Sequence, residues 1–172
     1  MKNCMKLIAI LVLSLFVFSP GVTRAEGIEE GSEISDFTLA DGLTGETVTF
    51  SKHIKGKTKY TAIIFANSSC GACRKELATL SKLSESSEDF KTYVILVDMK
   101  GAEIIKAFST QFNYNVTYLL DPDFSVPPLY GFYFTPSLII IDDKGVITYK
   151  KGGYNINQDE EIISKKVNEL LK

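Results

Sequence analysis

The sequence is poor in the residues that bind metals and haem. Among its 172 residues it has three cysteines, one histidine and no tryptophan. A zinc site takes four ligands, so Cys70, Cys73 and His53 could complete one only with carboxylates or across a dimer. Attachment of a c-type haem requires a histidine directly after the second cysteine of a C-x-x-C pair, and this chain has Arg74 there. Three roles for the cysteine pair therefore stay open: redox chemistry, metal handling and a structural disulfide.

Blocks of like charge and long apolar runs are also missing. Nothing in the charge pattern suggests a nucleic-acid partner. The longest uncharged apolar run, Leu7–Phe18, follows two lysines and precedes Thr23 and Ala25, which are small residues suited to a cleavage site. A membrane span needs about 20 apolar residues, so we predict a signal peptide over residues 1–25. The alternative is an uncleaved signal that tethers the protein to the membrane.

The remaining residues, 26–172, have the length of one domain. Cys4 would be removed with the signal, which leaves Cys70 and Cys73 as the cysteine pair of the mature chain. We expect this domain to lie outside the cytoplasmic membrane, in the periplasm or at the outer membrane face, where disulfides persist.

Apolar runs alternate with helical patterns along this domain. Runs typical of buried strands occupy residues 60–66, 93–98 and 136–142, with a shorter run at 117–121. Apolar residues at helical spacing follow Cys73 and Gly101 and close the chain. Hairpins are predicted around the glycine-containing turn of residues 36–50 and at residues 142–145. Strands that alternate with helices predict an α/β fold with a largely buried sheet.

The two cysteines fall between a predicted strand and a predicted helix. Cys70 comes four residues after Ala66, and the helical pattern starts around Cys73. The unpaired N–H groups at a helix N-terminus favour an anion, so we expect Cys70 to ionise more readily than a free thiol. Cys73, one turn further in, is placed to attack a mixed disulfide. A purely structural disulfide across so short a loop would stabilise little, which favours a redox pair.

The order of these motifs resembles the thioredoxin fold. A strand, C-x-x-C and a helix are followed later by Thr-Pro leading into a strand. The details are similar to the extracytoplasmic TlpA-like branch, which includes thiol–disulfide proteins of cytochrome c maturation. The likeness covers residues 28–172 and rests on three segments: residues 30–57, CGACRKEL at 70–77 and LYGFYFTPSLIIIDDKGVI at 129–147. It implies a thioredoxin fold with an N-terminal β-hairpin extension and an inserted helix.

The resemblance also implies roles for five residues. Cys70 would be the attacking cysteine and Cys73 the resolving one. Glu76 matches an acidic residue beside the cysteines, which would raise the pKa of the thiols or shuttle protons. Pro136 would follow a cis peptide bond and face the disulfide, and the backbone of Thr135 would pair with a bound substrate chain. From the residues alone, Glu76 would be interpreted as a solvated helix residue.

Several positions depart from related patterns. Ser69 replaces the aromatic residue that usually precedes the first cysteine, and Gly71 and Ala72 separate the pair, which leaves the redox direction open. Peroxiredoxins share the fold, but the segment FANSSC at 65–70 lacks their proline and threonine, which argues against peroxidase activity. Copper chaperones of this fold use a wider cysteine spacing and a later histidine, and the chain has neither.

We therefore expect an extracytoplasmic thiol–disulfide oxidoreductase that exchanges disulfides with partner proteins. The resemblance favours a monomeric reductant that uses no cofactor and receives electrons from a membrane carrier, with a place in cytochrome c maturation as one setting. Two other classes stay open: a metal-handling module that uses the cysteines as ligands, and a redox-inactive scaffold. Four aromatic residues form either a partner-docking surface or core, namely Tyr130, Phe132, Tyr133 and Phe134.

Overall fold

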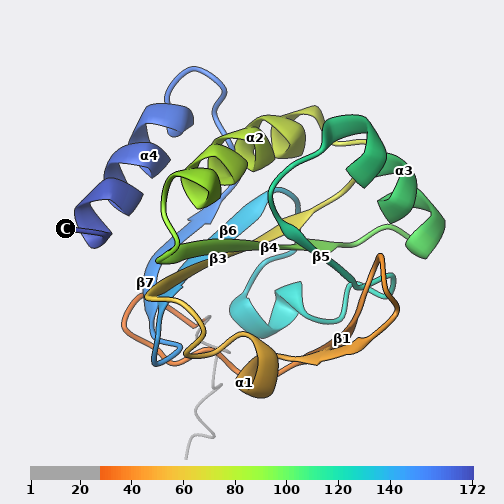
Figure 1. The fold of residues 1–172 in the computed structure, drawn as a ribbon, viewed down its shortest axis with the longest axis horizontal. Helices are drawn as coiled ribbons and strands as arrows, with labels where there is room; N and C mark the ends of the chain where they lie inside the picture. Colours follow the sequence, from red (N-terminus) through yellow and green to blue (C-terminus); the bar gives the residue numbers. More distant parts are fainter. Residues whose placement is uncertain (1–27) are drawn as a thin grey trace, which may run out of the picture.

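Seven strands form one mixed sheet through the middle of the protein, with helices on both faces (Figure 1). This computed structural model describes residues 28–172, so the predicted signal peptide lies outside the described residues. The strands are β1 (Thr38–Asp41), β2 (Thr47–Thr49), β3 (Tyr60–Ala66), β4 (Phe90–Leu96), β5 (Thr117–Leu120), β6 (Ser137–Asp142) and β7 (Ile147–Gly152). The helices are α1 (Phe50–His53), α2 (Gly71–Ser86), α3 (Ala102–Phe112) and α4 (Asp159–Leu170), with a 3-10 helix η1 (Pro127–Tyr130).

The sheet has the strand order β2-β1-β5-β4-β3-β6-β7. Strands β3, β4 and β5 are parallel neighbours. The β6–β7 hairpin pairs antiparallel with β3, and the β1–β2 hairpin pairs antiparallel with β5. Strand β3 has neighbours on both sides and helices over both faces, and its residues from Thr61 to Ala66 are all buried. The loop that leaves β3 therefore starts from a strand that is buried and is paired along both edges.

The alternation of side chains along β3 divides the core into two clusters. Ala62, Ile64 and Ala66 face α2, α3 and α4 on one side of the sheet. Ile63 and Phe65 face α1 and η1 on the other side. Figure 1 shows the same division, with α2 and α4 above the sheet and α1 below it. Burial on both faces explains why this strand is an uninterrupted apolar run.

The predicted α/β class and order of elements are confirmed, and the fold is thioredoxin-like with the N-terminal hairpin and the inserted helix α3. Two short elements, α1 and η1, were not predicted, because four residues are too few to show a period. Strand β4 begins at Phe90, three residues before the predicted run. Its first residues were missed because they alternate, with Phe90 and Thr92 buried and the charged Lys91 exposed, and so do not form an apolar run. Within residues 28–172, no helix is long and apolar enough to cross a membrane.

Gly42 lets the hairpin extension approach helix α3 closely. Its N–H donates a hydrogen bond to the carbonyl of Tyr118 at 2.8 Å. A Cβ atom at this position would lie 2.8 Å from Cγ2 of the fully buried Ile105 and closer still to its Cδ1. We expect Gly42→Ala to lower the free energy of unfolding by about 1–3 kcal/mol, the usual cost of overpacking. Urea unfolding would measure this.

The neighbouring Leu43→Ala is the matched control for the Gly42 substitution. Leu43 is exposed, so its truncation should change the free energy of unfolding by no more than about 0.5 kcal/mol. Equal stability of wild type and Gly42→Ala would show that α3 moves aside at no cost.

Candidate active site

Cys70 lies at the N-terminus of α2, in the loop that follows the central strand β3. It is the N-cap residue of this helix, and its sulfur accepts a hydrogen bond from the backbone N–H of Cys73 at 3.1 Å. The unpaired N–H groups of a helix N-terminus carry partial positive charge, which stabilises a thiolate formed there on reduction. The location agrees with the prediction, although the helix begins at Gly71, two residues before the apolar spacing starts.

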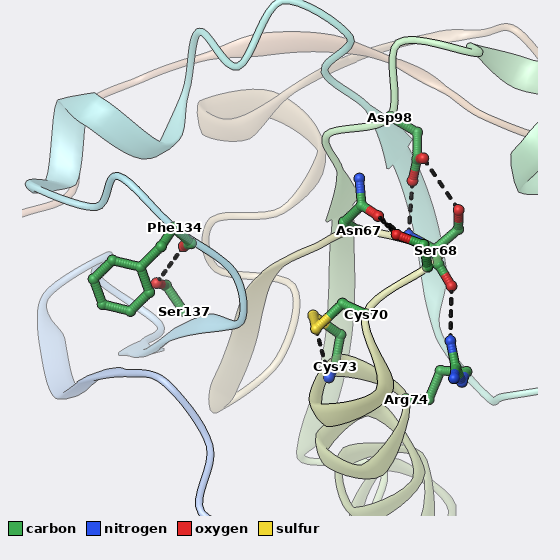
Figure 2. Close-up of a disulfide and its surroundings, with 9 residues drawn as sticks. Asn67, Ser68, Cys70, Cys73, Arg74, Asp98, Phe134 and Ser137 are labelled. Carbon is green, nitrogen blue, oxygen red and sulfur yellow. Dashed lines mark hydrogen bonds between the residues drawn. A yellow bond between two sulfur atoms is a disulfide. The ribbon is translucent and has the colours of Figure 1, made fainter.

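The loop before Cys70 is held by hydrogen bonds on every residue (Figure 2). The N–H and hydroxyl of Ser68 donate to the carboxylate of Asp98 at 2.8 and 3.1 Å. The N–H and hydroxyl of Ser69 donate to Oδ1 of Asn67 at 3.0 and 2.6 Å. The N–H of Cys70 donates to the carbonyl of Asn67 at 3.1 Å. Cys70 is therefore presented on a rigid turn rather than on a free loop.

Cys70 and Cys73 form a disulfide, with their Cα atoms 5.2 Å apart. The two residues differ in exposure, because Cys73 is fully buried whereas Cys70 is only partly buried. A sulfur atom of another protein can therefore approach Cys70 but not Cys73. This difference favours Cys70 as the attacking thiol and Cys73 as the resolving one.

The loop before β6 lies at the same end of the sheet as the cysteines. The first residue of β6, Ser137, pairs with Phe65 near the end of β3. The Thr135–Pro136 peptide bond is cis, as the resemblance implied. The carbonyl of Pro136 accepts a hydrogen bond from the N–H of Gly153 at 2.8 Å. Within residues 28–172 the backbone of Thr135 makes no hydrogen bond, so its N–H and carbonyl remain available to a partner chain.

Glu76 lies one turn after Cys73 on the buried side of α2. It is fully buried, and neither carboxylate oxygen has a hydrogen-bond partner among the described residues. Burial raises the pKa of the Glu76 carboxyl from 4.5 to about 8, the positive charge of Lys151 opposes this rise, and the negative charge of Asp159 adds to it. Residues three apart on a helix are neighbours, so the Glu76 carboxyl lies beside Cys73 and titrates close to neutral pH. The structure thus excludes the solvated position that the residues alone suggested.

An ion pair between β7 and α4 provides the charges that act on Glu76. Lys151 Nζ lies 2.9 Å from Oδ2 of Asp159, and Asp159 is itself buried. The backbone N–H of Asn155 donates to the same carboxylate oxygen. The positive charge of Lys151 and the negative charge of Asp159 act on Glu76 in opposite directions. The pair therefore offsets little of the free-energy cost of burying an ionised Glu76.

The aromatic residues before Pro136 divide into two groups. Tyr130 and Phe132 are buried in the core around Phe65. Tyr133 and Phe134 are exposed, at 74% and 55%. Only the second pair can contact a partner protein, and Figure 2 shows Phe134 on one side of the disulfide.

Three residues near the site were missed by the sequence analysis: Asp98, Lys151 and Asp159. A weak signal existed for Asp98, because it is an acidic residue just after a buried strand, at the sheet end where the loop of Cys70 also lies. Lys151 and Asp159 come from β7 and α4, far from the motif in sequence, and nothing in their local pattern indicates that they face Glu76. Among residues 28–172 no group of three or more histidine, cysteine or acidic side chains could hold a metal ion.

The AhpC/TSA family model matches residues 31–150 of the chain. The chain belongs to the AhpC/TSA family. The match spans the hairpin extension, the cysteine loop and the cis-proline loop, and it ends within β7. No curated protein sequence matches the chain significantly.

Solved structures of similar fold extend this result. A protein described as the thiol:disulfide interchange protein DsbE from Chlorobium tepidum aligns with a TM-score of 0.74 and 21% identity, over 84% of this chain and 99% of its own. One described as a protein disulfide isomerase from Bacteroides thetaiotaomicron aligns with a TM-score of 0.69 and 27% identity, over 84% and 91%. A secreted disulfide oxidoreductase from Mycobacterium tuberculosis aligns with a TM-score of 0.64 and 21% identity, over 77% and 95%.

These matches agree with the predicted thioredoxin-like fold of this AhpC/TSA-family protein. The neighbours are described as thiol–disulfide oxidoreductases, the enzyme class that the sequence predicted. The finer assignment to the TlpA-like branch stays a prediction.

Proposed function

We propose that this protein is an extracytoplasmic thiol–disulfide oxidoreductase that reduces disulfides in partner proteins. The observation that carries the proposal is the asymmetric cysteine pair. Cys70 caps α2 and is partly exposed, whereas Cys73 is fully buried one turn away. The match to the AhpC/TSA family and the descriptions of the structural neighbours support the same reaction.

The reaction proceeds through a mixed disulfide. The Cys70 thiolate attacks one sulfur of the partner disulfide, which releases the other partner sulfur as a thiolate that takes up a proton. The Cys73 thiol loses its proton, attacks the Cys70 sulfur and releases the second partner thiol. The partner gains two electrons and two protons, and the protein ends with a Cys70–Cys73 disulfide. A donor dithiol must then reduce this disulfide before the next cycle.

Glu76 serves as the proton acceptor for Cys73. A buried thiol needs a base close by before it can attack, and the raised pKa of Glu76, about 8, suits this exchange near neutral pH. The unpaired backbone of Thr135, next to Pro136, pairs with the partner chain and aligns its disulfide with Cys70. Tyr133 and Phe134 give the partner an apolar contact beside that backbone.

The setting follows from the predicted signal peptide. The protein acts as a monomer in the periplasm or at the outer face of the membrane. A membrane electron carrier that accepts reducing equivalents from the cytoplasm returns it to the dithiol form. Cysteine pairs of apocytochromes c are one class of substrate that this reductant would keep reduced.

The reduction potential of the cysteine pair tests the direction of the reaction. We expect residues 26–172, equilibrated in dithiothreitol buffers and trapped with a thiol reagent, to give a value closer to −270 mV, the potential of a thioredoxin-type reductant, than to −120 mV, that of a strong oxidant. One physical reason is the full burial of Cys73, since an apolar environment disfavours a thiolate and so destabilises the ionised reduced form.

The same measurement has two outcomes that contradict the proposal. A potential near −120 mV would make the protein an oxidant that donates its disulfide. Absence of a reversible disulfide would exclude exchange, and a titration with copper(I) or zinc would then test the metal-handling alternative. Full-length protein measured in the same buffers controls for any effect of residues 1–25.

A further inference from the structure

A hollow opens beside the cysteine loop, on the side away from Phe134. It has a volume of about 620 Å³ and lies between the start of α2 and helix α3. Ser68 and Ser69 form one wall, Arg74 and Lys100 provide its two charged groups, and Phe112 belongs to its apolar wall. The reaction proposed above does not involve this hollow, although its lining includes Ser69, the residue directly before Cys70.

The guanidinium of Arg74 is held in place within this hollow. Its Nη1–H donates to the carbonyl of Ser68 at 3.0 Å, and its Cζ lies 5.8 Å from the centre of the Phe112 ring. The Phe112 ring in turn stacks on Tyr114, with ring centres 5.5 Å apart, and the Tyr114 hydroxyl donates to the carbonyl of Arg74. An arginine fixed in this way loses little further conformational freedom when it binds an anion.

No carboxylate of the described residues forms an ion pair with either of these two cations. Among residues 28–172, neither Arg74 nor Lys100 lies within ion-pair distance of an acidic side chain. The nearby Asp98 accepts both hydrogen bonds of Ser68 and does not line the hollow. One of the five N–H donors of the Arg74 guanidinium is used, and the others are free for an acceptor. The hollow is therefore a local positive site in a chain of net charge −2.

A partner chain bound at Cys70 would extend across this hollow. Figure 2 shows the disulfide between the Phe134–Ser137 loop on one side and Arg74 on the other. A polypeptide whose backbone paired with Thr135 and whose sulfur reached Cys70 would cross the disulfide in the direction of Arg74. A residue two or three positions from the substrate cysteine then has the reach to place its side chain in the hollow, because an extended chain advances about 3.3 Å per residue.

We propose that the hollow binds an acidic side chain of the protein substrate, close in sequence to the cysteine that Cys70 attacks. This inference rests on the proposed function and names one feature of its substrates. The carboxylate accepts hydrogen bonds from the Arg74 guanidinium and is attracted by Lys100, while its methylene groups contact Phe112. A polypeptide is favoured over a small anionic thiol because Phe134 and the unpaired Thr135 backbone extend the surface across the other side of the disulfide.

Pairs of short cysteine peptides, each prepared as a disulfide-linked dimer, test this proposal. The two members of a pair differ only in Glu or Gln, two or three residues before or after the cysteine. The rate of their reduction by the dithiol form of the protein is followed at low salt. We expect the Glu peptide of the favoured register to react about fivefold faster than its Gln partner, the scale of one partly exposed ion pair. Salt at 0.5 M should reduce this preference.

Two substitutions locate the preference in the hollow. In Arg74→Gln and in Lys100→Gln we expect the Glu-to-Gln rate ratio to fall toward one. Differences in intrinsic reactivity between the peptides cancel when the ratio is compared between variants. Lys75→Gln on α2 and Lys106→Gln on α3 are the matched controls, because both lysines are exposed and lie outside the hollow. Lys100 is exposed, so its variant tests the proposal even if Arg74→Gln does not fold.

The other outcomes are distinguishable. Equal rates for Glu and Gln peptides in every register would overturn the inference and leave the proposed function standing. A preference that persists in both hollow variants would place anion recognition elsewhere. If glutathione disulfide alone showed the dependence on Arg74 and Lys100, the occupant would be a small anionic thiol instead. No exchange with any peptide would contradict the proposed function itself.

Discussion

Cys70→Ser is expected to abolish thiol–disulfide exchange. A serine hydroxyl cannot replace the thiolate as nucleophile, and removal of the nucleophile in a covalent catalyst lowers the rate by about 10⁴–10⁶-fold. Reduction of a peptide disulfide, followed with the Cys70→Ser protein at the wild-type concentration, should therefore fall to the background rate. The substitution leaves one cysteine in the domain, Cys73, which is fully buried.

Cys73→Ser is the matched control for this experiment. This variant keeps the partly exposed sulfur of Cys70 at the N-terminus of α2 but cannot resolve the mixed disulfide. We expect a stable covalent adduct between Cys70 and the peptide, visible by mass spectrometry and reversed by dithiothreitol. An adduct on Cys73 in the Cys70→Ser protein, at a rate similar to wild type, would reverse the assignment of the two roles.

Glu76→Gln is expected to remove a large pH dependence of stability. The carboxyl has a pKa of 4.5 when unfolded and about 8 in the folded protein. Between these values the folded state binds the extra proton, so the free energy of unfolding of the wild type falls as pH rises from about 4.5 to 8. The shift corresponds to a loss on the order of 5 kcal/mol. Glutamine is neutral throughout, so the variant avoids this loss.

Urea unfolding of the disulfide forms at pH 5, 7 and 9 measures the effect without titration of the cysteines. We expect Glu76→Gln and wild type to be of similar stability at pH 5, and the variant to be the more stable at pH 9. Ionisable groups remote from Glu76 cancel in the difference. Lys151, Asp159, Tyr149 and Tyr154 interact electrostatically with Glu76, so the difference reports this carboxyl together with its coupling to them. Glu88→Gln, at an exposed position, should show no such difference. A constant gap between Glu76→Gln and wild type would mean that Glu76 titrates normally.

Cys70 and Glu76 were both named by the family resemblance. The two residues differ in how well the sequence alone predicts their location. The position of Cys70 follows from local order, because a buried strand ends four residues before it and a helix begins directly after it. Glu76 is different. Its neighbours Lys75 and Arg74 are polar, and a glutamate in a charged stretch of helix is normally exposed. Without the resemblance, its burial would not have been expected.

The sequence by itself determined the class and order of the fold. Strands β3 and β6 are apolar because they are buried on both faces, and the helices show a spacing that follows from 3.6 residues per turn. These patterns are local consequences of burial, so they can be recognised in short stretches of sequence. The same holds for the cysteine pair, whose spacing alone brings the sulfurs within reach of each other.

Only the tertiary structure decided which charges and surfaces surround the cysteines. Asp159 comes near Glu76 because α4 packs against α2, and Lys151 of β7 pairs with Asp159. Arg74 and Lys100 line one hollow because α3 lies beside the cysteine loop. Tyr130 and Phe132 are core whereas Tyr133 and Phe134 are surface, although all four lie within five residues. Electrostatic and docking properties depend on distances in space between residues far apart in the chain. No local pattern records those distances.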